Sequence, residues 1–189
     1  MMRAMLASKS RKHPFVPPFA LTICGIFEFG GLDRRRFTHI VSIWHPSETT
    51  AERIRLIPEV FPRASVHSVI FDDIEEELPN FHPPKKEQIR KVLDFGEGVG
   101  QGAHLLVHCM AGISRSTACA MAILARHSEP GSERPIAEYI QEIRPQAMPN
   151  RLVLAHADEL LERDGALLGA CDAVFGAPIG DPLINKGWE

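Results

Sequence analysis

The chain has 189 residues, a formal net charge of −3, 44% hydrophobic and 24% charged residues. These values are those of an ordinary globular protein, and the length suits one domain with a substantial core. The small negative charge gives no general attraction to nucleic acid or to an anionic membrane, so neither is expected as a partner. No apolar run approaches the ~20 residues that cross a bilayer.

Residues 1–18 are basic and contain three prolines, without the apolar stretch of a secretory signal. We expect a flexible N-terminal tail and a soluble, cytoplasmic protein. The four cysteines are scattered and lack the paired spacing of zinc ligands, so we expect reduced thiols and no metal. They are Cys24, Cys109, Cys119 and Cys171.

Apolar segments alternate between strand-like and helix-like spacing along most of the chain. The predicted strands are 19–26, 38–44, 66–71 and 103–107. The predicted helices are 51–61, 85–96, 116–127, 135–143 and 151–163, and Pro58 is a candidate break in the first of them. This alternation predicts an α/β domain over 19–163, with a mostly parallel sheet of four to five strands and helices on both faces. Residues 164–189 form a C-terminal arm for which no structure is predicted.

The segment 108–115, His-Cys-Met-Ala-Gly-Ile-Ser-Arg, lies between a predicted central strand and a predicted helix. A tight loop that opens a helix directs successive backbone N–H groups at one point, where the helix dipole also favours negative charge. Arg115 adds a planar fork that suits two oxygens of a phosphate. The same field favours the thiolate of Cys109, which is the nucleophilic form of cysteine. One loop can therefore hold a phosphate and attack it.

These residues resemble the Cys-x5-Arg signature of the protein tyrosine phosphatase superfamily, and the run 111–116 is closest to its dual-specificity branch. The run 143–150, with Arg144 and a Pro-Asn turn behind the active loop, is also similar to compact bacterial tyrosine phosphatase-like proteins. The resemblance implies that Cys109 is the nucleophile and that Arg115 binds phosphate. It implies that His108 orders the loop and that Ser116 assists the thiolate. The remaining loop positions, Met110, Ala111, Gly112, Ile113 and Ser114, would surround the phosphate.

Such phosphatases need an acid that protonates the leaving oxygen, and positioned proton transfer contributes roughly 10²–10⁴ in rate. In the family this aspartate follows a strand some distance before the cysteine. Asp73 matches that position best, and Asp72 is the alternative. The acidic run 72–77 is otherwise read as a solvated loop.

The resemblance implies a cysteine-dependent phosphatase without a cofactor, acting on phosphotyrosine in proteins and also on phosphoserine or phosphothreonine. Inorganic phosphate or sulfate is expected to fit the loop. Two alternatives stay open: a phosphoinositide or RNA 5′-phosphatase, and a non-catalytic phosphate-binding module. The sequence predicts neither the physiological substrate nor the oligomeric state.

Overall fold

The structure is a computed structural model that describes residues 15–176. Most of the predicted N-terminal tail and the last 13 residues lie outside this range. The strands are β1 (Ala20–Gly25), β2 (His39–Trp44), β3 (Ser65–Ile70) and β4 (His104–Cys109). The helices are α1 (Thr50–Val60), α2 (Lys86–Glu97), α3 (Arg115–Arg126), α4 (Glu133–Ile143), α5 (Arg151–Leu160) and α6 (Ala166–Phe175). Two short 3-10 helices, η1 (Ile26–Gly31) and η2 (Arg34–Arg36), follow β1.

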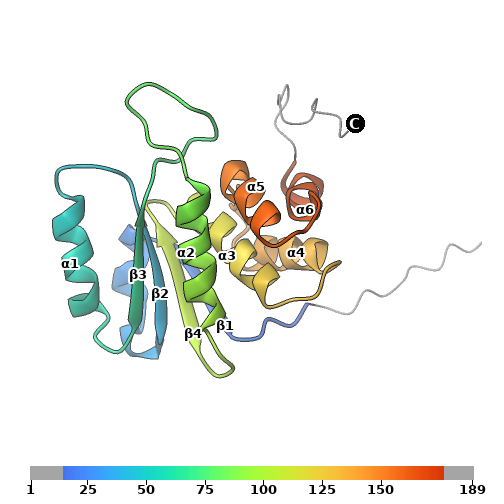
Figure 1. Cartoon of the computed structure of the whole chain (residues 1–189). Coiled ribbons are helices and arrows are strands. Elements are labelled where there is room, and N and C mark those ends of the chain that lie inside the picture. Colours follow the sequence, from blue (N-terminus) through green and yellow to red (C-terminus); the bar gives the residue numbers. More distant parts are fainter. Residues whose placement is uncertain (1–14, 177–189) are drawn as a thin grey trace, which may run out of the picture.

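The described strands form one parallel sheet in the order β1-β4-β2-β3, which confirms the predicted fold class (Figure 1). Strand β4 is central, paired with β1 on one side and β2 on the other. Because all four strands run the same way, their carboxyl ends share one edge of the sheet. In such sheets ligands bind beyond that edge.

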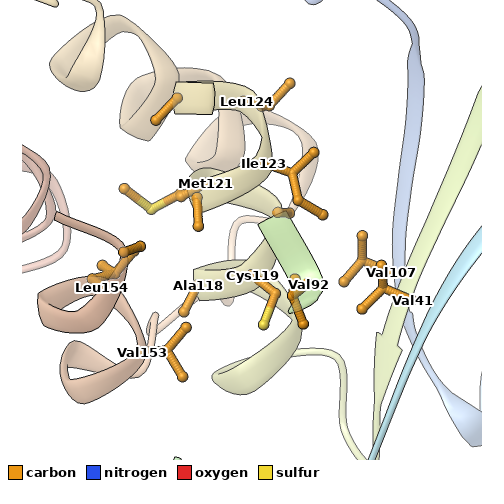
Figure 2. Close-up of a cluster of buried hydrophobic side chains, with 14 of the residues drawn as sticks. Val41, Val92, Val107, Ala118, Cys119, Met121, Ile123, Leu124, Val153 and Leu154 are labelled. Atoms are coloured by element: carbon orange, nitrogen blue, oxygen red, sulfur yellow. The ribbon is translucent and has the colours of Figure 1, made fainter. Parts of the chain in front are cut away.

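The larger core lies between the sheet and α2 to α6. Helix α3 is its centre, and every residue of the helix except Arg126 is buried. Its alanines allow close approach on several sides, which suits a helix without a solvent face. Figure 2 shows α3 with Val41 and Val107 from the sheet on one side, and Val153 and Leu154 from α5 on the other.

A smaller core on the opposite face packs α1 and η1 against the sheet. Ile57 and Phe61 from the end of α1 meet Ile40 and Trp44 of β2 in this cluster. The candidate break at Pro58 does not end α1, because Phe61 N still donates to Ile57 O at 2.9 Å and the last turn closes.

Helical structure continues beyond residue 163. Helix α5 stops at Leu160, three residues before its predicted end, and α6 then packs against α4 and α5. The buried carboxylate of Asp158 accepts from the backbone N–H groups of Gly165 (2.6 Å), Leu167 (2.7 Å) and Leu168 (3.1 Å). These bonds satisfy donors that a helix start leaves unpaired, so α5 fixes where α6 begins.

Candidate active site

The loop 110–114 joins the end of β4 to the start of α3, at the carboxyl edge of the sheet. Gly112 adopts φ 72°, and a Cβ there would lie 2.3 Å from the carbonyl carbon of Cys24. A Cβ on Gly25 would lie 2.8 Å from Met110 O. The two glycines therefore let the end of β1 pack directly against the loop, which no larger residue would allow.

Two carbonyl groups of the loop are held from outside by Arg144. Its Nε donates to Gly112 O at 2.9 Å and its Nη2 donates to Ala111 O at 3.0 Å. Glu28 of η1 accepts from the same guanidinium at 2.8 and 2.6 Å, and also from Gly25 N at 2.6 Å. These hydrogen bonds, which Arg144 donates and Glu28 accepts, lower the pKa of Glu28 and raise the pKa of Arg144. Outward-held carbonyls leave the N–H groups of the loop free to turn inward.

Cys109 ends β4 with its thiol buried beneath the loop. Gly112 N donates to Cys109 Sγ at 3.3 Å, and Ser116 Oγ lies 3.3 Å from the same sulfur. Both groups can donate to a thiolate, which hydrogen bonds to its charged form stabilise. Ser116 is itself buried in the first turn of α3.

The Arg115 side chain is buried and reaches toward the end of β3. Its Nη1 donates to Phe71 O at 2.9 Å, and its Nε lies 3.6 Å from Asp73 Oδ2. Arg115 Nε has no hydrogen-bond partner among the described residues. The carbonyl of Phe71 thus fixes one edge of the guanidinium and leaves a donor beside Asp73.

The two neighbouring aspartates occupy different environments. Asp73 Oδ1 accepts from Ser114 Oγ at 2.6 Å and from Asn150 Nδ2 at 3.1 Å, so this carboxylate lies on the phosphate loop. The Asp72 side chain instead accepts from His82 N at 2.8 Å. Of the two, Asp73 is the aspartate that contacts the phosphate loop and lies beside Arg115.

His108 lies on the other face of β4, away from the thiol. Its Nε2 is 2.8 Å from Ser42 Oγ, and Trp44 Nε1 donates to the same oxygen at 2.7 Å. The rings of Trp44 and Phe29 meet the imidazole edge-on. Burial lowers the pKa of His108 to about 4, so the imidazole is neutral at physiological pH. It packs in the core next to the strand end that carries Cys109.

Sequence reasoning missed Glu28 and Ser42, two polar residues that hold the site. Neither belongs to a motif, and each meets its partner only through the tertiary fold. Across the residues that the structure describes, no three His, Cys, Asp or Glu side chains are grouped so that they could hold a metal ion. Within the same range, no helix has the length and apolarity needed to traverse a bilayer.

Known proteins with similar sequences are phosphatases. The chain is 36% identical over 121 residues to human protein phosphatase Slingshot homolog 3, covering 63% of this chain and 16% of that protein. It is 31% identical over 97 residues to tyrosine-protein phosphatase vhp-1 of Caenorhabditis elegans, covering 51% of this chain and 13% of that protein. The chain thus spans under a fifth of the length of these relatives. No protein family's sequence model matches it.

Solved structures share the fold. Tk-PTP in its active form has a TM-score of 0.53 at 20% identity, covering 79% of this chain and 96% of that chain. Human DUSP28 has a TM-score of 0.52 at 20% identity, covering 80% and 96%.

In this chain, the central strand of a four-stranded parallel sheet ends at Cys109, and the loop that follows is suited to bind phosphate. The sequence relatives described above are protein phosphatases, and the fold of the chain is similar to the folds of Tk-PTP and human DUSP28.

Proposed function

We propose that this chain is a cysteine-dependent phosphatase that hydrolyses phosphotyrosine in proteins, with phosphoserine and phosphothreonine as further substrates. The observation that carries the proposal is the convergence on one loop of the Cys109 thiol, the Arg115 guanidinium and the Asp73 carboxyl group. These three groups come from β4, the start of α3 and the segment after β3.

In the first step, the Cys109 thiolate attacks phosphorus and the bond from phosphorus to the ester oxygen breaks. Asp73 gives its proton to that leaving oxygen, so that an alcohol or phenol departs. Arg115 and the N–H groups of the loop hold the phosphoryl oxygens where charge accumulates. The product on the protein is a phosphocysteine.

In the second step, water attacks the phosphocysteine and Asp73 takes a proton from it. The bond from sulfur to phosphorus breaks, and inorganic phosphate leaves. Ser116 Oγ, 3.3 Å from the sulfur, donates to the departing thiolate. No metal or organic cofactor takes part in this scheme.

The alternatives have less support. The loop side chains Met110, Ala111 and Ile113 are neutral, and a polyphosphorylated lipid headgroup would gain from additional cations there. A non-catalytic phosphate-binding module would need neither a nucleophile nor an acid, yet Cys109 precedes the phosphate loop and Asp73 is hydrogen-bonded to it. The four cysteines are free and buried, which supports a reducing compartment such as the cytoplasm.

A substrate panel tests the proposal. We expect turnover of phosphotyrosyl and, more slowly, phosphothreonyl peptides, with weak turnover of an inositide or an RNA 5′-phosphate. Cys109→Ser should abolish turnover and still bind inorganic phosphate or vanadate. Cys171→Ser is the matched control, because this cysteine is equally buried but lies in α6. A Cys109→Ser variant that keeps more than about a hundredth of wild-type kcat would overturn the mechanism.

A further inference from the structure

The segment that carries Asp73 continues into a loop that projects from the molecule. Every residue from Glu75 to His82 is exposed. Figure 1 shows this loop between β3 and α2, standing beyond the carboxyl edge of the sheet, where the phosphate loop also lies. An exposed stretch of this kind contributes little to the folded core, so its side chains are free to meet another molecule.

The base of the loop is fixed on both sides. Asp72 N donates to His82 O at 2.7 Å, and His82 N donates to Asp72 Oδ2 at 2.8 Å, which closes the loop across ten residues. On the side of the site, Asn150 Nδ2 donates to Ile74 O at 3.3 Å and Arg151 N donates to Glu75 Oε1 at 2.7 Å. The loop therefore starts and ends at defined positions beside the candidate active site.

The tip of the loop is apolar. Leu78 is 38% exposed and Phe81 is 52% exposed, and neither belongs to the two core clusters of the described residues. Phe81 N donates to Leu78 O at 3.2 Å, and Asn80 adopts φ 65°, so a tight turn sets the two side chains at its ends. Two large apolar side chains held together at the ends of this turn offer an apolar contact to another molecule.

The flank of the loop is acidic. The run 72–77 contains five acidic residues and no basic residue. Asp72, Asp73 and Glu75 are engaged by the contacts above. Glu76 and Glu77 are exposed and form no hydrogen bond or ion pair among the described residues. Two unpaired carboxylates therefore precede the apolar tip.

We infer that residues 76–81 form a docking arm for phosphoprotein substrates in which basic and apolar residues lie close to the phosphorylated residue. The inference rests on the proposed function, because the phosphate is held at Cys109 and Arg115. Glu76 is three residues from Asp73, a span of at most ~11 Å. An extended substrate covers the same distance in about three residues. A lysine or arginine within about three residues of the phosphorylated residue therefore meets the carboxylates of Glu76 and Glu77. An apolar residue further along then meets Leu78 and Phe81.

The charge of the arm selects this occupant over a membrane. An anionic lipid surface would be repelled by Glu76 and Glu77, whereas a basic peptide segment is attracted at distances up to the ~8 Å screening length of physiological salt. Insertion of Phe81 into a bilayer would bring the same carboxylates to the lipid headgroups.

A matched peptide pair tests the arm. Both peptides contain one phosphotyrosine, flanked in the first by lysine and leucine and in the second by glutamate and serine. We expect kcat/KM to favour the first at least about tenfold, the magnitude of one to two surface charge pairs with a buried apolar contact. The preference should come from a lower KM for the first peptide, and the ratio of the two kcat/KM values should decrease in high salt. Glu76→Gln/Glu77→Gln and Phe81→Ser should each reduce it severalfold.

The controls separate this inference from the proposed function. Glu59→Gln and Leu56→Ser replace exposed residues of the same types on α1, and they should leave the preference intact. Turnover of a small aryl phosphate should be unchanged in all four variants. If kcat/KM is equal for the two peptides and the aryl phosphate is still hydrolysed, the inference of a docking arm is wrong and the proposed function stands. Phe81-dependent sedimentation with phosphatidylserine vesicles would also overturn it, in favour of a membrane. Failure to hydrolyse any substrate would overturn the proposed function itself.

Discussion

Asp73 Oδ1 lies 2.6 Å from Ser114 Oγ, so the carboxyl group after β3 is tied to the phosphate loop before any substrate is bound. Asn150 Nδ2 holds the same oxygen from the start of α5. Catalytic groups that are already positioned need little reorganisation during the reaction. The second oxygen, Oδ2, remains the one closer to Arg115.

We expect Asp73→Asn to lower kcat for phosphotyrosine by about 10²-fold or more, because the leaving phenolate would depart without a proton. The loss should be much smaller with p-nitrophenyl phosphate, whose leaving oxygen needs little protonation. Asp72→Asn is the matched control, since an asparagine oxygen can still accept from His82 N and close the base of the loop. If the leaving-group dependence appears in Asp72→Asn instead, the acid is Asp72.

Arg115→Lys tests the guanidinium fork. Lysine keeps the charge but lacks the planar set of separated donors that bonds Phe71 O and still presents two N–H groups to phosphoryl oxygens, so kcat/KM should fall at least about 10²-fold. Arg126→Lys, an exposed arginine in the last turn of α3, should have no effect on kcat/KM. Unchanged kinetics in Arg115→Lys would remove this residue from the site.

Glu28→Gln should loosen the phosphate loop and change its acid stability. The pKa of Glu28 is lowered in the fold, so its ionised form stabilises the protein above pH 4.5 and this contribution is lost as the pH falls through the lower folded value. Acid titration of folding, followed by circular dichroism, should show wild type resisting acid better than Glu28→Gln. Since Arg144 also loses its charged partner, kcat should fall as well. The same acid midpoint in both proteins would contradict the role of the pair.

His108 should make the protein less stable in mild acid. Its pKa is about 4 in the fold against an ordinary value of 6.5, so between these values the unfolded chain binds a proton that the native state does not. Stability therefore falls as the pH drops from 6.5 toward 4, by about 3 kcal/mol for this group. The free energy of unfolding, measured with urea at several pH values, should change less steeply with pH in His108→Gln than in the wild type. Ser42→Ala, which removes the hydroxyl partner of His108 Nε2, should lower the free energy of unfolding at every pH and keep its dependence on pH.

Cys109 should be the first thiol alkylated by iodoacetamide. Burial raises the pKa of Cys24 to about 12 and that of Cys171 to about 11, and it also raises the pKa of Cys119, so these three remain protonated at neutral pH. Cys109 is the cysteine with donors directed at its sulfur. Peptide mass spectrometry after brief labelling should find Cys109 modified, and inorganic phosphate should protect it. Prior labelling of another cysteine would contradict this account.

Much of the fold could be predicted because most of its strands and helices depend on residues that are close together in the sequence. The strands differ from their predicted ranges by at most two residues at either end, since runs of β-branched and apolar residues bounded by turn residues carry the signal. Helix α6 was not predicted, because its apolar sequence has no amphipathic period and its start is fixed by Asp158, which lies in α5.

The sequence by itself determined the α/β class, the strand–loop–helix setting of Cys109 and Arg115, and the presence of an acid after the third strand. These features depend on neighbours in the chain, where spacing sets geometry. Only the tertiary structure decided which aspartate reaches the loop, because Asp72 and Asp73 are neighbours in the sequence and differ in their partners. Asp73 accepts from Ser114 Oγ, and Asp72 accepts from His82 N. The tertiary structure also decided that Glu28 clamps Arg144 and that Ser42 supports His108, since these residues are 116 and 66 positions apart from their partners. Such contacts form when the fold packs segments that are distant in the sequence against one another, and no local pattern records them.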